Sequence, residues 1–143
     1  MKLMKFNISA KSESRTKTVV TARDFKMVID EPEILGGEDH GANPVEYLLG
    51  ALAGCLNVVG HIVAQEMGFD FKGMDISIEG GLNPDKFLGK SSKDRTGYQY
   101  VNVTIKPHTN ASKETLEKWL KTVEERCPVS DNIKNETPLK LSL

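Results

Sequence analysis

The sequence has few of the features that mark disulfide-rich or nucleic-acid-binding proteins. It contains only 2 cysteines and 1 tryptophan among 143 residues, and aromatic residues make up 6% of the chain. Two cysteines are too few for a secreted scaffold held together by disulfides, so we expect two free thiols in a reducing compartment. The scarcity of aromatic side chains argues against a surface on which nucleic-acid bases stack.

An excess of charge of either sign is also absent. The chain has 19 basic and 20 acidic residues, and its formal net charge is −1. Proteins that bind nucleic acids or anionic membranes usually carry an excess of positive charge, which this chain does not have. We therefore expect no nucleic-acid partner and no membrane partner.

The sequence also lacks a signal peptide and a convincing membrane span. Residues 1–6 contain neither an apolar signal core nor a small-residue cleavage site, which favours a cytoplasmic protein. Residues 47–64 carry no formal charge and are long enough to cross a bilayer, but Asn57 and His61 interrupt them. No basic cluster flanks this segment, so we interpret it as a core helix.

The hydrophobic pattern predicts a single α+β domain over residues 1–143, with largely antiparallel sheets in the order β-β-β-α-β-β-α-β. A helix should run from Asn43 to Met67, because Asn43 is a good N-cap, Pro44 suits the first turn and Gly68 can end it. A second helix should begin at Ser112 and stop at Cys127, before a proline. The expected strands cover residues 2–10, 16–22, 25–29, 72–80, 98–106 and 139–143, and a short helix is expected over 128–133.

Apolar side chains occur nearly all round the expected helix 43–67. Such a helix must be covered on every side. A chain of this size has little material to wrap it, so the pattern favours a partner subunit that supplies part of the cover.

The two cysteines are the main candidates for chemistry. Cys55 lies three turns into its helix, too far from the N-terminal dipole to be activated by it, so its thiolate would need a cation from elsewhere in the fold. Cys127 would be the N-cap of a helix that begins at Pro128, where free backbone N–H groups favour a thiolate. The alternatives are that Cys55 is a small core residue and that Cys127 fills a corner between helices.

Other chemistries have weaker support. His40, His61 and His108 do not form a zinc-ligand spacing with each other or with the cysteines, so we expect no metal. Glu46 stands three residues after Asn43 and is well placed to cap the helix. It could also hold an arginine near Cys55.

Two motifs together resemble the OsmC/Ohr family of osmotically inducible and organic hydroperoxide resistance proteins. The first runs from Asn43 to Cys55 and begins NPVEYLL; the second, ERCPVS, contains Cys127. The resemblance implies an intertwined homodimer in which two long central helices are flanked by sheets. It further implies a thiol peroxidase without a bound cofactor, which reduces organic hydroperoxides and is regenerated by a dithiol or a lipoylated protein. In this comparison Cys55 matches the peroxidatic cysteine and Cys127 the resolving cysteine.

The chain departs from the peroxidase pattern at one position. The active family members have glutamate directly after the helix-starting proline, where it orients an arginine onto the thiolate, whereas this chain has Val45 there and Glu46 next. One residue rotates a helical side chain by about 100°. Arg23 is the better candidate for the activating arginine, and Arg15 is the second. The departure leaves open a dimeric ligand-binding or redox-sensing protein without peroxidase activity, and a structural domain with inert cysteines.

Overall fold

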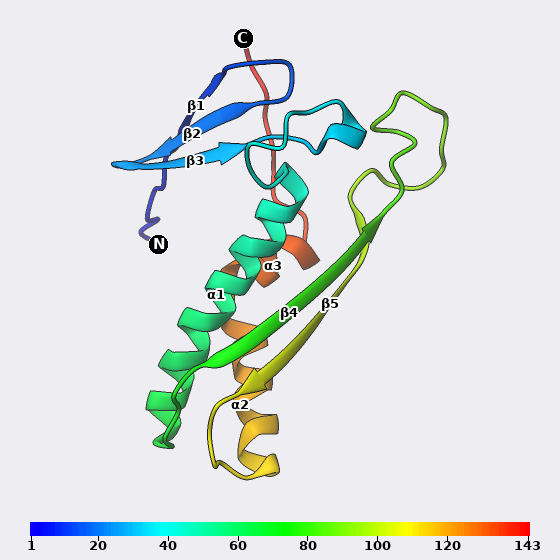
Figure 1. The fold of residues 1–143 in the computed structure, drawn as a ribbon. Helices are drawn as coiled ribbons and strands as arrows, with labels where there is room; N and C mark the ends of the chain where they lie inside the picture. Colours follow the sequence, from blue (N-terminus) through cyan, green and yellow to red (C-terminus); the bar gives the residue numbers. More distant parts are fainter. The chain divides into compact units, whose positions relative to one another are not determined.

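Antiparallel pairing builds both sheets of the computed structural model, which describes residues Met1–Leu143 and has a mixed α+β architecture (Figure 1). The contacts divide the chain into two units, Met1–Leu48 and Leu49–Leu143. The expected α+β class is confirmed. A single domain over the whole chain stays a prediction.

The first unit contains a three-stranded meander in the order β1-β2-β3. Its strands are β1 (Ser9–Ser12), β2 (Thr18–Ala22) and β3 (Phe25–Ile29). The third strand agrees with the prediction, but the first is shorter than the predicted 2–10. Only Ser9 to Ser12 find partners on β2, and a strand exists only where a neighbour completes its hydrogen bonds.

A buried carboxylate organises the loop that follows β3. The Asp30 side chain is 0% exposed and accepts hydrogen bonds from the backbone N–H groups of Glu31 (2.8 Å) and His40 (3.2 Å). His40 Nδ1 lies 3.0 Å from the same carboxylate. Between these contacts the chain forms a short 3-10 helix, η1 (Glu33–Leu35). Pro32, Gly36, Gly37 and Gly41 predict a loop over residues 30–42, and these contacts hold that loop in place.

The long helix α1 (Pro44–Met67) begins and ends as its capping residues predict. Asn43 and Glu46 exchange hydrogen bonds of 2.9 Å, each side chain accepting from the other's backbone N–H, and Gly68 takes the left-handed conformation at φ 76°. These contacts satisfy donors and acceptors that a helix end leaves unpaired.

The chain alone covers only one stripe of α1. Its buried residues are Leu52, Leu56, Val59, Gly60, Val63 and Ala64, whereas Val58 is 58% exposed and Ile62 is 42% exposed. The expectation that α1 is covered on every side is therefore not met within one chain. By length and composition α1 could cross a bilayer, but one such helix is weak evidence, since core helices of soluble proteins have the same character.

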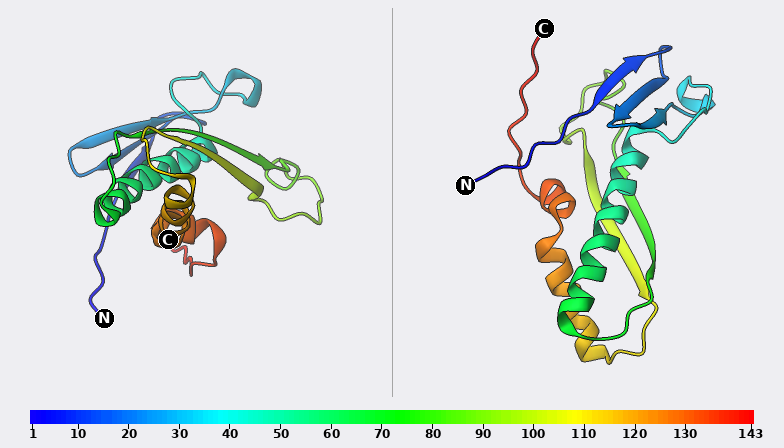
Figure 2. Two further views of the ribbon diagram at one scale, coloured as in Figure 1. Left: turned by 90° about the horizontal axis from the view of Figure 1, so that it is seen from below. Right: turned by 90° about the vertical axis from the view of Figure 1, so that its left-hand side faces the viewer.

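The second unit packs helices on one face of a two-stranded hairpin. The hairpin consists of β4 (Met74–Leu82) and β5 (Tyr98–Pro107), and α1 and α2 (Lys113–Arg126) lie side by side on one of its faces (Figure 2). A short helix, α3 (Pro128–Lys134), follows directly. Alternating residues of β4 such as Ile76 and Ile78 pack against the buried cluster between the helices.

Trp119 joins α2 to α1 at the centre of this core. Its side chain is 2% exposed, and its indole N–H donates to the carbonyl of Gly60 at 2.8 Å. A Cβ on Gly60 would lie 2.4 Å from the Met74 methyl group and 3.0 Å from the indole ring. Gly60 therefore permits the close approach of the two helices.

Two expectations for this unit are wrong. Residues 139–143 form no strand, and Leu139 and Leu141 are 86% and 89% exposed, because no strand of this chain pairs with them. The helical spacing of Leu116, Trp119, Leu120 and Val123 predicts that all four point inward, but Leu120 is 47% exposed. It lies on the side of α2 that faces an open cavity.

Candidate active site: two thiols beside an apolar cavity

Cys55 lies in the middle of α1 and packs against the core that α1 shares with α2. Neighbouring Leu52 and Leu56 on α1 are buried, while Cys55 itself is half-buried and packs against the core cluster that includes Cys127. The thiol is free. Part of Cys55 is therefore exposed in this chain.

Cys127 occupies the corner between α2 and α3. It ends α2, caps α3 and is 1% exposed. Its Sγ accepts a hydrogen bond from the backbone N–H of Ser130 at 3.4 Å. Pro128 at the first position of α3 forces the chain to turn here, which points the thiol back into the core.

The fold brings the two thiols into contact. Cys55 packs against the buried cluster that contains Cys127, and its thiol is close enough to affect the pKa of Cys127, although the two residues are far apart in the sequence and belong to different helices. Burial raises the pKa of the Cys127 thiol, and the neighbouring Cys55 raises it further, while the Ser130 N–H opposes both effects. Cys127 therefore resists ionisation, since a thiolate there would be desolvated and close to a second sulfur.

Arg126, the cationic residue directly before Cys127, forms an ion pair with a carboxylate of α1. Arg126 forms a two-pronged ion pair with Glu66 on α1, with Nη2 3.2 Å from Oε1. This pairing raises the pKa of Arg126 and lowers the pKa of Glu66. The guanidinium thus ties two helices together.

Arg23 and Glu46 belong to the first unit, whereas both thiols belong to the second. Arg23 stands at the turn between β2 and β3 with a left-handed φ of 56°, and its guanidinium lies 4.9 Å from the centre of the Phe25 ring. Glu46 caps α1 through Asn43. Their assignment to the site stays a prediction, as does that of Arg15.

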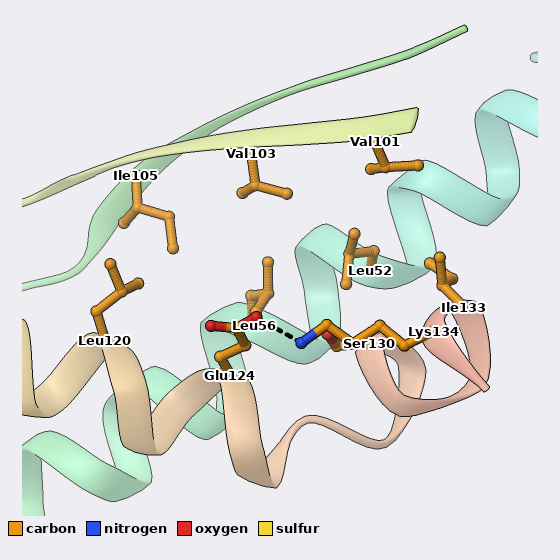
Figure 3. A pocket seen from close by; sticks show the side chains of 10 residues that line it. All are labelled: Leu52, Leu56, Val101, Val103, Ile105, Leu120, Glu124, Ser130, Ile133 and Lys134. Atoms are coloured by element: carbon orange, nitrogen blue, oxygen red, sulfur yellow. Dashed lines mark hydrogen bonds and ion pairs between the residues drawn. The ribbon is translucent and has the colours of Figure 1, made fainter. Parts of the chain in front are cut away.

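An apolar cavity of about 360 Å³ opens in the second unit, and its wall includes Leu52 and Leu56, which flank Cys55 in the sequence of α1 (Figure 3). Side chains of β5 point across it toward the helices, and Ser130, whose N–H contacts Cys127, lies in its wall. An ion pair between Glu124 of α2 and Lys134 of α3 stands at its polar side. The lining residues are Leu52, Leu56, Val101, Val103, Ile105, Leu120, Glu124, Ser130, Ile133 and Lys134.

Sequence reasoning did not identify Ser130 or the Glu124–Lys134 pair. Ser130 could have been found, because the third residue after an N-cap commonly donates its N–H to the capping side chain. The ion pair depends on how α3 turns back beside α2, which no local pattern reveals. The structure contains no group of three or more His, Cys, Asp or Glu side chains placed to hold a metal ion.

Comparison with known proteins identifies the fold and the family. The model of the OsmC-like protein family matches residues 36–142, while no curated protein matches the chain. The structure is similar to an OsmC-like protein from Mycoplasma pneumoniae, with a TM-score of 0.80 and 17% identity over 92% of this chain and 88% of that one.

Two further similar structures bear names that refer to hydroperoxides. One is an organic hydroperoxide resistance protein OsmC from Legionella pneumophila, with a TM-score of 0.67 and 20% identity over 94% of this chain and 92% of that one. The other is a putative organic hydroperoxide resistance protein from Vibrio cholerae with captopril in one of its active sites, with a TM-score of 0.65 and 19% identity over 94% and 87% of the two chains. At these identities the structures support the fold, and the family match over residues 36–142 shows that the chain belongs to the OsmC-like protein family.

Proposed function

We propose that this protein is a thiol-dependent peroxidase that reduces organic hydroperoxides and protects the cell from oxidative stress. The observation that carries the proposal is the contact between the Cys55 and Cys127 thiols. Two free thiols that lie next to each other can be oxidised to a disulfide with little rearrangement of the chain. Cysteines that serve only as core residues do not need to lie next to each other.

The burial of the two thiols assigns their roles. Cys55 is half-buried and therefore more accessible than the buried Cys127, so we assign it as the nucleophile. Cys127 is 1% exposed, and its raised pKa keeps it protonated at neutral pH. We therefore assign Cys127 as the resolving thiol, which reacts only after Cys55 has been oxidised to a sulfenic acid.

The reaction balances with these two residues and one external reductant. The Cys55 thiolate attacks the terminal oxygen of the hydroperoxide, the O–O bond breaks, and the alkoxide takes a proton to leave as an alcohol. Cys55 becomes a sulfenic acid. The Cys127 sulfur then attacks the Cys55 sulfur, and the sulfenic oxygen leaves as water to give the disulfide. An external dithiol restores both thiols by exchange and is itself oxidised to a disulfide.

The cavity favours an apolar substrate. Most of its lining residues are aliphatic, including Leu52, Leu56 and Val103, and its wall also contains Ser130, whose N–H contacts the Cys127 sulfur. A pocket with this lining gains more from an alkyl or aryl group than from the small, polar hydrogen peroxide. Organic hydroperoxides are therefore the expected substrates.

The remaining parts of the proposal concern partners and location. A dithiol or lipoylated protein is the expected reductant, no bound cofactor is required, and the expected location is the cytoplasm. A homodimer would cover the open face of α1, where Gly50 and Gly54 have no neighbouring atoms in the chain alone. In such a dimer Arg23, or else Arg15, would supply the cation that stabilises a Cys55 thiolate.

Trapping the sulfenic acid tests the proposal. Dimedone labels only sulfenic acid, so cumene hydroperoxide should make Cys127→Ser protein react with dimedone at Cys55, as measured by peptide mass spectrometry. The wild type should instead form the Cys55–Cys127 disulfide, and Cys55→Ser should consume no peroxide. If dimedone never labels Cys55 while peroxide is consumed, Cys55 is not the nucleophile and the proposal is wrong.

A second candidate is a dimeric ligand-binding or redox-sensing protein without peroxidase turnover. The observation that favours it is the use of Glu46 as a helix cap, together with Val45 at the position of the family glutamate. Native mass spectrometry that reveals a copurified apolar ligand, in a protein that does not turn over hydroperoxide, would favour this function.

A further inference from the structure

The loop between β4 and β5, residues 83–97, carries an unusual set of exposed side chains. In sequence it contains Lys86, Lys90, Lys93 and Arg95 against two carboxylates, Asp85 and Asp94. It extends beyond the end of the hairpin (Figure 1; Figure 2, left). The loop therefore has an excess of cations, although the whole chain has nearly equal numbers of basic and acidic residues.

The loop is held in a defined conformation. The Asn83 amide donates to the Asp94 carboxylate at 2.8 Å, and its oxygen accepts from the Asp85 N–H at 3.0 Å. Residues 84–90 form a turn, closed by the Lys90 N–H to Asp85 carbonyl bond of 2.8 Å and by Gly89 at φ 78°. These bonds fix which side chains the loop presents.

The closed turn presents apolar and basic groups together. Phe87 is 65% exposed and Leu88 is 53% exposed, and they follow directly after Lys86. Lys86 and Lys93 form no ion pair, and the Arg95 guanidinium donates to the Tyr98 carbonyl at 2.6 Å rather than to a carboxylate. By contrast, Lys113 and Lys118 on α2 pair with Glu117 and Glu114.

The loop also lies close to the cavity beside the thiols. It ends where β5 begins at Tyr98, and Val101, three residues further, lines the cavity. Three residues of extended strand span about 10 Å. A protein that touches the loop could therefore present a reactive group at the cavity.

From this arrangement we infer that residues 83–97 are a docking surface for an acidic protein that delivers the reducing dithiol. The inference rests on the proposed function, because it concerns the reductant of the same site. Redox partners meet briefly through small interfaces, for which complementary charge raises the association rate. Phe87 supplies the exposed aromatic anchor that such small interfaces use.

The test measures how fast a peptide-borne dithiol reduces the Cys55–Cys127 disulfide. The probes are dihydrolipoyl-lysine peptides flanked by glutamates or by serines, with free dihydrolipoamide as a carrier-free reference. At low ionic strength the acidic peptide should react about tenfold faster than the serine peptide, and salt should remove the difference. Lys86→Gln/Lys93→Gln should abolish this advantage and leave the rate with dihydrolipoamide unchanged.

A matched variant controls for the loss of two cations. Lys113→Gln/Lys118→Gln removes the same charge from α2 and should keep the advantage of the acidic peptide. Phe87→Ser should raise KM for the acidic peptide and leave the salt dependence intact. Equal rates for the acidic and serine peptides with the wild type, or equal losses in both lysine variants, would overturn the docking surface.

Other outcomes also bear on the inference. Binding of the loop to anionic vesicles, without any preference for the acidic peptide, would overturn the assignment of a protein partner. If peroxide produces the Cys55–Cys127 disulfide but no dithiol reduces this disulfide, the proposed peroxidase function is wrong. If dihydrolipoamide reduces it normally and the acidic peptide has no advantage, only the docking surface fails.

Discussion

At the scale of single residues, burial distinguishes two thiols that are in contact with each other. Cys127 is enclosed between α2 and α3, while Cys55 remains half-buried. The more accessible thiol is the one that an oxidant reaches first. The difference in access sets an order for the two steps.

Alkylation by iodoacetamide should report this difference. In Cys55→Ser protein, the alkylation rate of Cys127 should level off at a higher pH than that of an ordinary cysteine, because burial raises its pKa. Unfolding the same variant should return the profile to that of a free thiol. A Cys127 profile that levels off below pH about 8.5 in the folded protein would contradict the account.

The hydrogen bonds of the Asp30 carboxylate predict how the stability of the fold changes at acid pH. Hydrogen bonds from the side chain of Thr16, from the backbone of Glu31 and His40, and from the His40 ring lower its pKa, against the opposing effect of burial. The folded state therefore binds this proton less readily than the unfolded state, so the stabilisation is present above pH about 4 and is lost as the pH falls toward the folded pKa.

The variant Asp30→Asn should remove this dependence. Its thermal midpoint should be lower than that of the wild type at neutral pH, and the gap between the two should narrow on acidification. Circular dichroism melts at several pH values measure this directly. A gap that stays constant down to the acid transition would show that the Asp30 carboxylate does not contribute.

At the scale of elements, local capping rules account for the helices. Asn43, Glu46 and Gly68 bound α1, Ser112 caps α2, and the Cys127-Pro128 step separates α2 from α3. Each of these signals acts within a few residues, so the sequence alone could predict them. The pairing of strands depends on distant residues and was predicted less well at both ends of the chain.

Glu46 provides the element-scale test. Glu46→Ala should lower the free energy of unfolding by about 0.5–2 kcal/mol, because one N–H at the start of α1 loses its acceptor. Glu46→Gln should retain most of the stability, since glutamine also serves in a capping box. Chemical denaturation measures both.

Peroxidase activity of the same variants separates the two roles of Glu46. If the side chain acts only as a cap, Glu46→Gln should keep the activity of the wild type. A large loss of activity in Glu46→Gln, with stability retained, would show that the carboxylate charge itself positions a cation at Cys55.

At the scale of the whole molecule, the chain leaves an apolar helix face without cover. Val58 and Ile62 are exposed on α1, and Gly50 and Gly54 face open space. A second copy packed on this face would bury it. Gly54→Leu should prevent close approach of the two helices and yield a monomer, or a weaker dimer, in light scattering after size-exclusion chromatography. An unchanged mass for this variant, with a dimeric wild type, would place the interface elsewhere.

The sequence predicts the helices and the two cysteines of the candidate site, but not their surroundings. Nothing local shows that Leu120 faces a cavity, or that Glu124 and Lys134 pair beside it, because both depend on how α3 turns back beside α2. The alternating leucines at the C-terminus suggest a strand, yet a strand forms only where a partner strand is present. Family resemblance, rather than periodicity, supplied the link between Cys55 and Cys127.

The most direct test of the central claim is to map the cysteines after the protein reacts with one equivalent of cumene hydroperoxide. Non-reducing peptide mass spectrometry should find a single Cys55–Cys127 disulfide within one chain, formed as the peroxide is converted to its alcohol. Peroxide consumption that leaves both cysteines reduced, or that oxidises each one separately without a link between them, would contradict the account.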